Sequence, residues 1–108
     1  MTSTQSSTDT PVMEIVTFRL NAGVANDDFR QAASAIDHLL RQRGTAASRR
    51  LVVDEDGLWT DIIEWASLAE AKSAAEDLVQ DPLFAPLGAM IDGASVVMRH
   101  APVQHRMG

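Results

Sequence analysis

The chain has 108 residues, no cysteine, and nine Lys and Arg against 15 Asp and Glu, for a formal charge of −6. This length suits one soluble domain, and the lack of cysteine excludes disulfides, zinc–cysteine sites and a cysteine nucleophile. The acidic balance argues against a nucleic acid partner, because a phosphate backbone is bound by clustered Lys and Arg. No apolar run approaches the roughly twenty residues that span a bilayer, and no basic, apolar leader is present, so we expect a cytoplasmic protein without membrane contact.

The sequence predicts one folded domain with unstructured ends. Residues 1–11 are mostly Ser, Thr, Gln and Asp, which bury too little to offset their ordering entropy, so we expect a disordered leader there. The domain is predicted over residues 12–103, with residues 104–108 as a tail. Its first strand is predicted over residues 12–20, because β-branched and aromatic residues there are followed by an Asn-Ala-Gly turn.

A helix is expected after this strand. Asn26 or Asp27 can cap its start, and Gly44 stops it directly after Arg43. The apolar residues between these points recur at helical spacing and form one stripe: Phe29, Ala32, Ala33, Ile36, Leu39 and Leu40.

A hairpin follows the first helix. Residues 46–53 and 58–65 have the composition of strands. The segment between them reads Asp-Glu-Asp-Gly, and its Asp-Gly pair supplies the positive φ that a tight hairpin needs.

The second half of the domain repeats a helix and a strand. Ser67 and Glu70 have the spacing of a capping box, which predicts a helix over residues 67–80. A connector over residues 83–91, interrupted by Pro and Gly, then leads to a last strand over residues 94–100.

The order strand, helix, strand, strand, helix, strand predicts an α+β, ferredoxin-like βαββαβ fold. In this fold two helices cover one face of a four-stranded antiparallel sheet of order 4-1-3-2. Within that order we expect the last strand to run antiparallel to the first and the third strand to run parallel to it.

Apolar residues fall on both faces of the predicted strands, as in Ile15-Val16 and Ile62-Ile63. Two helices cover only one face, so a second copy of the chain is expected on the other, which predicts a homodimer. The alternative is that strands of high β-propensity simply tolerate exposed Val and Ile.

One family resemblance rests on several short stretches of the chain. The third predicted strand ends Ile-Ile-Glu-Trp-Ala-Ser at residues 62–67, the capped helix continues through Glu70 and Ala71, and Asp-Pro-Leu-Phe follows at residues 81–84. These features, over residues 12–103, resemble the dimeric α/β-barrel superfamily and, within it, the antibiotic biosynthesis monooxygenase-like group. The resemblance implies two subunits whose sheets close into one barrel, with a pocket between sheet and helices in each.

The resemblance implies several activities. Members of the superfamily include cofactor-independent monooxygenases of aromatic polyketides, haem-degrading enzymes and proteins without assigned chemistry. Haem-degrading members use an Asn on the first strand, a Trp at the end of the third and a His on the second helix; only Trp65 matches here. Tyrosine, which assists in some polyketide monooxygenases, is absent from the chain. No cofactor is expected.

Three side chains are predicted to form a catalytic cluster. Glu14 is a carboxylate among apolar residues on the central first strand, where a charge needs a partner. The strand directions expected above bring His100 and Asp61 toward the same end of the sheet. On a shared face the three would form an acid/base cluster that abstracts a proton or positions water. They could also bind a divalent metal, but no recognised ligand spacing is present and no metal site is predicted.

Ion pairing is the alternative interpretation of these residues. Glu14 could pair with Arg99, and Asp61 with Arg49 or Arg50 across the hairpin, leaving His100 as an edge residue. Because side chains alternate along a strand, only one of Arg99 and His100 can meet Glu14.

A wall for a flat aromatic substrate is predicted on the same face. Trp59 and Trp65 flank Asp61 on the third strand, and Phe18 and Met98 are the further candidates for substrate contact. Core or interface packing is the alternative role of these side chains.

Two functions therefore stay open. The first is a cofactor-independent, monooxygenase-like enzyme that holds a small apolar or aromatic substrate between sheet and helices of a homodimer. The second is a non-catalytic ligand-binding or stress-related homodimer, in which the same residues serve the core and the interface.

Overall fold

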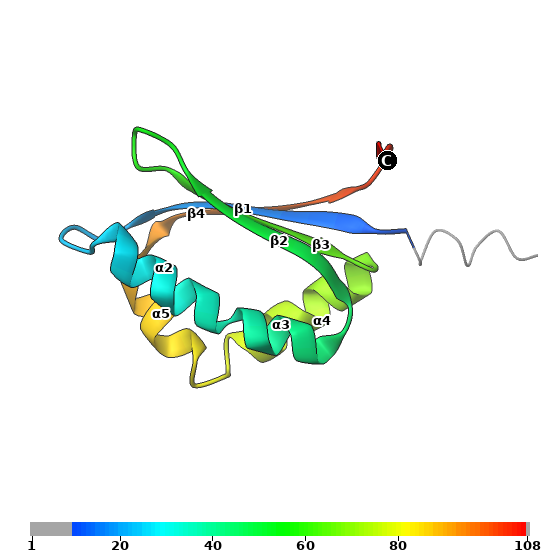
Figure 1. The fold of residues 1–108 in the computed structure, drawn as a ribbon, viewed down its shortest axis with the longest axis horizontal. Helices are drawn as coiled ribbons and strands as arrows, with labels where there is room; N and C mark the ends of the chain where they lie inside the picture. The colour runs from blue at the N-terminus through cyan, green and yellow to red at the C-terminus, as the bar shows by residue number, and fades with distance from the viewer. Residues whose placement is uncertain (1–9, 108) are drawn as a thin grey trace, which may run out of the picture.

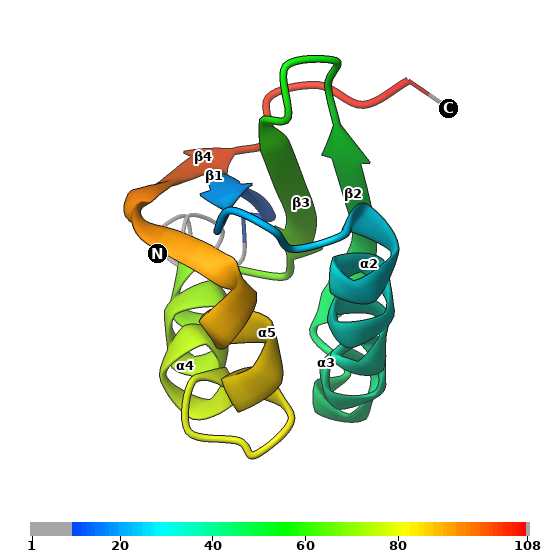
Figure 2. The same ribbon diagram turned by 90° about the vertical axis from the view of Figure 1, so that its left-hand side faces the viewer.

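The computed structural model describes residues 10–107, so residues 1–9 of the predicted leader lie outside the described part. The elements in chain order are β1 (Val12–Leu20), α2 (Asn26–Ala35), α3 (Asp37–Arg43), β2 (Ala46–Val53), β3 (Trp59–Trp65), α4 (Leu68–Leu78), α5 (Phe84–Met90) and β4 (Ile91–Pro102). The strands form one sheet of order β2-β3-β1-β4, which is the predicted order written from the other edge. The helices all lie on one face of the sheet (Figures 1 and 2). The predicted ferredoxin-like fold is confirmed.

The direction expected for the third strand is wrong. β3 runs antiparallel to β1, with Phe18 opposite Trp59 and Val16 opposite Asp61. The helical crossover returns β2 parallel to β1, and the hairpin then reverses the chain, so β3 must oppose β1. Asp61 nevertheless shares a face with Glu14, because Glu14 and Val16 are two residues apart on β1 and paired residues point to the same side.

The first predicted helix is divided in two. Ile36 separates α2 from α3, and its backbone N–H bonds the carbonyl of Ala33 at 3.2 Å, three residues back. The predicted cap is wrong, since Ala25 takes the cap position and no side chain bonds the helix start. Gly44 ends α3 as predicted, with φ 75°. Ser67 caps α4 as predicted, by accepting a hydrogen bond from the Glu70 backbone N–H at 3.2 Å.

The segment predicted as a connector forms helix α5. Pro86 is tolerated because it stands in the first turn, where its missing N–H is not required. Gly88 lets the Phe84 ring approach, because a Cβ at this position would lie 3.0 Å from the ring. β4 begins directly after α5 and is longer at both ends than the predicted strand.

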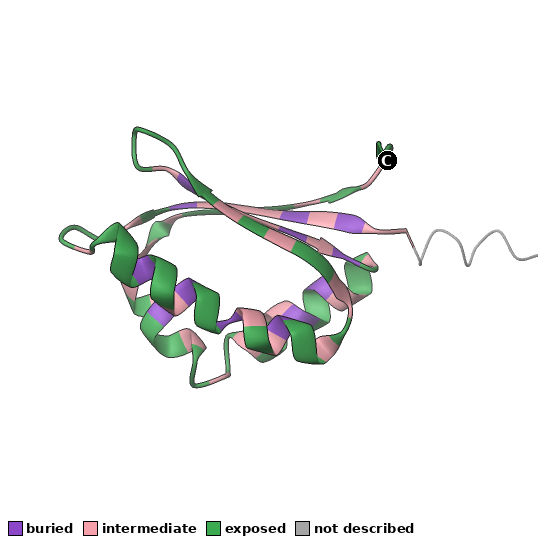
Figure 3. Cartoon of the chain, in the orientation of Figure 1, coloured by how far each residue is buried: buried purple, intermediate pink, exposed green. Residues whose placement is uncertain are grey.

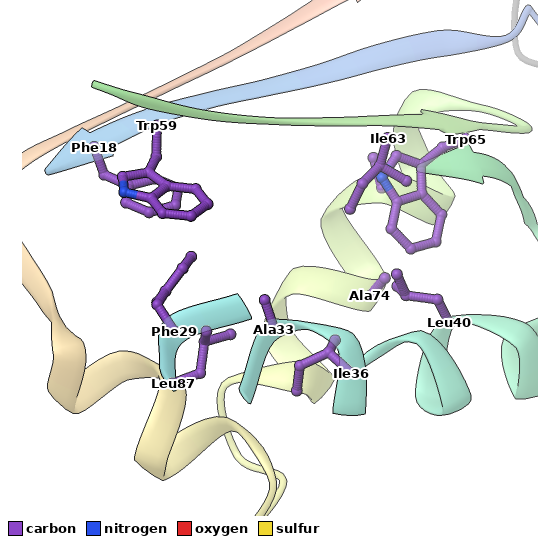
Figure 4. Close-up of a cluster of buried hydrophobic side chains, with 11 residues drawn as sticks. Phe18, Phe29, Ala33, Ile36, Leu40, Trp59, Ile63, Trp65, Ala74 and Leu87 are labelled. Atoms are coloured by element: carbon purple, nitrogen blue, oxygen red, sulfur yellow. The ribbon is translucent and has the colours of Figure 1, made fainter. Parts of the chain in front are cut away.

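The core lies between the sheet and the helices (Figure 3). Phe18 and Trp59 stack from the sheet, and Phe29 from α2 meets both rings edge-on, at centroid distances of 5.4 and 4.8 Å (Figure 4). Ala71 and Ala74 are fully buried on α4, which brings that helix close to the sheet. No helix within residues 10–107 is long and apolar enough to cross a membrane.

The opposite face of the sheet is not covered by helices and carries apolar side chains. Ile15 lies opposite Ile62 there and both are half-buried, while Val52 and Val97 are exposed. Apolar residues therefore lie on both faces of the sheet, as the strand pattern predicts.

Candidate functional site

A cavity of about 400 Å³ lies between the sheet and the helices. Its wall is mostly apolar, with contributions from β1, β3, β4 and the helices. The lining side chains include Val16, Phe18, Phe29, Ile36, Leu40, Ile63, Leu78, Val79, Phe84, Leu87, Ile91, Val96 and Met98. Three charged residues, Glu14, Arg49 and Asp61, also reach it. Such a cavity suits a small, mainly apolar molecule oriented by few polar groups.

Glu14 is the buried carboxylate of this cavity, and its side chain is only 8% exposed. Its Oε1 accepts a hydrogen bond from Trp65 Nε1 at 3.3 Å, and its Oε2 lies 3.0 Å from His100 Nε2. The register explains the contact, because His100 lies directly opposite Glu14 in the ladder between β1 and β4. Arg99 lies opposite Ile15 and points to the other face, so it does not meet Glu14.

Asp61 is held by arginine. Arg49 donates from Nε and Nη2 to the two oxygens of Asp61, at 3.0 and 2.7 Å. Its Nη1 also donates to the Ala33 carbonyl at 2.7 Å and to Asp37 at 2.9 Å. Burial alone lowers the pKa of Arg49, but the hydrogen bonds and charges of Asp61 and Asp37 outweigh it and raise the pKa above its ordinary value. This arginine therefore ties β2 and β3 to α2 and α3 as a permanent cation.

The three predicted acid/base residues thus share one face but divide into two pairs. Glu14 and His100 contact each other, and Asp61 is occupied by Arg49, as one alternative from the sequence has it. Arg50 is exposed and lies opposite Ile62, on the face away from the helices.

The four predicted substrate contacts also divide. Phe18 and Met98 line the cavity, whereas Trp59 and Trp65 are buried in the core and form no part of its wall. Trp65 still acts on the site through its hydrogen bond to Glu14.

Several wall residues were not predicted because they lie on the segment interpreted as a connector. Phe84, Leu87 and Ile91 all line the cavity from α5 and the start of β4. The spacing of Phe84 and Leu87 by three residues is the signal that could have identified the inward face of this helix. The sequence predicts Arg49 only as an ion-pair partner of Asp61.

Within residues 10–107, no group of three or more His, Asp or Glu side chains could hold a metal ion. The polar groups in and beside the cavity are one carboxylate with its imidazole neighbour and one arginine–carboxylate pair. A carboxylate facing an apolar space can accept a proton from a bound molecule. An imidazole at 3.0 Å can share that proton.

No model of a known protein family matches this sequence, and no curated protein sequence matches it. Solved structures share the fold. A protein from Caulobacter crescentus, provisionally assigned as an antibiotic biosynthesis monooxygenase, has a TM-score of 0.70 at 10% identity, over 94% of this chain and 96% of that one. SnoaB, a cofactor-independent oxygenase from Streptomyces nogalater, has a TM-score of 0.61 at 16% identity, over 92% and 96%. A dimeric ferredoxin-like protein of unknown function from Thermobifida fusca has a TM-score of 0.67 at 14% identity, over 87% and 92%.

These structures confirm the predicted ferredoxin-like fold, which this chain shares with them over most of its length. Their identities to this chain are all below 20%. The structural similarity therefore shows the fold alone, and the chemistry follows from the residues of the cavity.

Proposed function

We propose that this protein is an enzyme that binds a small apolar or aromatic substrate in the cavity and removes a proton from it with Glu14. The observation that carries the proposal is a buried carboxylate facing a largely apolar space of about 400 Å³, with an imidazole 3.0 Å away. The fold shared with the cofactor-independent oxygenase SnoaB supports monooxygenase-like chemistry as the reaction.

The chemistry balances without an external reductant. A substrate CH2 group that loses a proton to Glu14 becomes an electron-rich carbanion, which can transfer electrons to O2. One oxygen atom of O2 then ends as a ketone on the substrate, and the other leaves as water with the two hydrogens of the CH2 group. The role assigned to the chain is to bind the substrate, exclude water from it and accept the proton at Glu14.

The test of binding uses a substitution that fills the cavity. Ala75 lines the cavity from α4, so Ala75→Phe should weaken binding of an anthrone, a flat aromatic ketone with an acidic CH2 group, by about tenfold or more. Ala35→Phe is the matched control, because Ala35 is exposed on α2. Circular dichroism checks that both variants fold. Equal binding by the two variants would place the ligand outside the cavity.

The test of catalysis measures oxygen uptake with the same anthrone. Glu14→Gln should slow the reaction by about a hundredfold or more, the usual range for loss of a general base. Glu76→Gln, at an exposed position on α4, should leave the rate unchanged. Tight binding without any acceleration of oxygen uptake by the unaltered protein would favour the second function, a ligand-binding homodimer without catalysis.

We also propose that the uncovered face of the sheet pairs with a second copy of the chain. Its half-buried Ile15 and Ile62 and exposed Val52 and Val97 would otherwise face water. The Thermobifida fusca structure of the same fold is dimeric. Ile62→Arg should convert the dimer to a monomer in size-exclusion chromatography with light scattering, whereas Leu83→Arg, exposed in the loop before α5, should not. A monomeric unaltered protein at micromolar concentration would refute the pairing.

A further inference from the structure

His100 lines a second hollow that is separate from the cavity. This outer hollow has a volume of about 470 Å³ and lies between the start of β1, the end of β4 and the first turns of α4; it is lined by Thr10, Val12, Leu68, Ala69, Lys72, His100 and Pro102. Glu14 lines the cavity but not the outer hollow, and His100 lines the outer hollow but not the cavity. The two contacting side chains therefore connect two spaces.

Of the two side chains, the one that lines the outer hollow is the more exposed to solvent. The Glu14 side chain is 8% exposed, and that of His100 is 20% exposed. Trp65, which is buried, holds the other oxygen of Glu14 and so fixes the carboxylate between indole and imidazole. Of the two hydrogen-bond partners of Glu14, Trp65 is buried, so the contact with His100 is the one that leads to the outer hollow.

We propose that Glu14 and His100 form a proton exit that carries a substrate proton from the cavity to water in the outer hollow. This inference rests on the proposed function, because it assumes that a ligand in the cavity gives up a proton. It assigns His100 a role in moving the proton rather than in touching the substrate.

Each step conserves protons and charge. The X–H bond of the bound molecule breaks, its electron pair stays on X, and the proton forms an O–H bond on Glu14. Neutral His100, with its Nε2 lone pair toward Glu14, takes this proton and becomes an imidazolium beside a carboxylate. The imidazolium then releases its Nδ1 proton to water in the outer hollow, and a turn of the ring brings the resulting Nδ1 lone pair toward Glu14 and resets the pair. The net change is one proton moved from the ligand to solvent.

The two spaces give the ligand and the proton different routes. Val79, Val96 and Met98 are exposed and line the cavity, so its mouth lies between β4 and the end of α4. The outer hollow lies at the start of α4, where Lys72 is the charged side chain that shares its wall with His100. A ligand seated in the mouth would block solvent there, while His100 would stay in contact with water.

The test uses para-nitrophenol, whose ionised form is yellow, at a pH where the free probe is mostly neutral. Glu14 should raise the rate at which the yellow form of the bound probe appears after rapid mixing, so this rate should be about tenfold higher in the unaltered protein than in Glu14→Gln. His100→Ala should lose most of this increase, and added imidazole, which fits the vacated space, should restore it. Pyrazole, a ring of the same size but a far weaker base, should not. His38→Gln is the matched control, because His38 is exposed on α3.

The outcomes separate this inference from the proposed function. An unchanged rate of ionisation in His100→Ala, or failure of imidazole to restore a slowed rate, would overturn the proton exit while leaving Glu14 as a base. Absence of probe binding by the unaltered protein would count against the proposed function. In that case nitrogen NMR of the histidine rings tests the contact between Glu14 and His100 without a ligand. In that experiment Glu14→Gln should change the His100 resonances and leave those of His38 unchanged, and an unchanged His100 would refute the coupling.

Discussion

Replacing Arg49 by methionine should be the most damaging single change to the sheet–helix junction. The variant keeps an unbranched apolar stem but removes four hydrogen bonds, two of them to Asp61. The side chains of Arg49 and Asp61 are 13% and 17% exposed, so the substitution leaves a largely buried carboxylate without a partner. Breaking such a pair costs about 3–5 kcal/mol. Asp37 is 37% exposed and adds little, because an exposed ion pair is worth about 0–1 kcal/mol.

The measurement is urea unfolding followed by tryptophan fluorescence at neutral pH. The pKa of Arg49 is raised in the folded state, so its contribution is complete below the ordinary arginine pKa and is lost only above it, which makes neutral pH suitable. A loss of 3–5 kcal/mol should lower the melting temperature by about 15–30 °C for a domain of this size. Arg41→Met is the matched control, because Arg41 is exposed on α3.

A double variant separates the ion pair from simple packing. Arg49→Met with Asp61→Leu removes both charges, so the double variant should recover more than half of the stability that Arg49→Met loses. The reasoning is refuted by a loss below about 1 kcal/mol for Arg49→Met, or by a double variant no more stable than the single one.

Three further stability predictions follow from local structure, each measured by urea unfolding. Ser67→Ala removes the cap of α4 and should cost about 1 kcal/mol, so an unchanged midpoint would contradict the capping role. Gly44→Ala places a Cβ in the left-handed region at φ 75° and should cost about 1–2 kcal/mol, and a stabilised variant would show that α3 ends differently. Leu87→Ala should cost about 2–5 kcal/mol because the side chain is buried, and a value near zero would remove α5 from the core.

The fold could be predicted because local signals and topology agree. The hairpin turn, the capping box and Gly44 mark where elements begin or end, and the order of those elements leaves few arrangements of the sheet. The break at Ile36 could not be predicted in this way. The break lies where Arg49 reaches the helix. Arg49 contacts Ala33 and Asp37, which are 16 and 12 positions away in the sequence, and a helical period does not reveal such contacts.

The candidate site was predicted less completely. Alternation shows which residues share a side within one strand, but a common face for Glu14, Asp61 and His100 was only a condition of the predicted cluster. The register between the strands meets this condition. The partner of each side chain also depends on the direction and register of the strands. Because β3 was predicted to run parallel to β1, Asp61 was grouped with His100. The depth of Trp59 and Trp65 depends on how the helices pack against the sheet, and their strand pattern alone is the same for a wall and for a core.

The two tryptophans lie at different ends of the core and have different neighbours. Trp59 contacts only aromatic rings among the interactions described for it, whereas Trp65 donates a hydrogen bond to Glu14. The chain has no tyrosine, so its ultraviolet fluorescence comes from these two indoles. Trp59→Phe therefore leaves a protein whose emission follows the charge on Glu14, and Trp65→Phe leaves one whose emission follows the packing around Phe18 and Phe29. The filling of the cavity and the movement of a proton can then be timed separately in parallel mixing experiments on the two variants, without an added label.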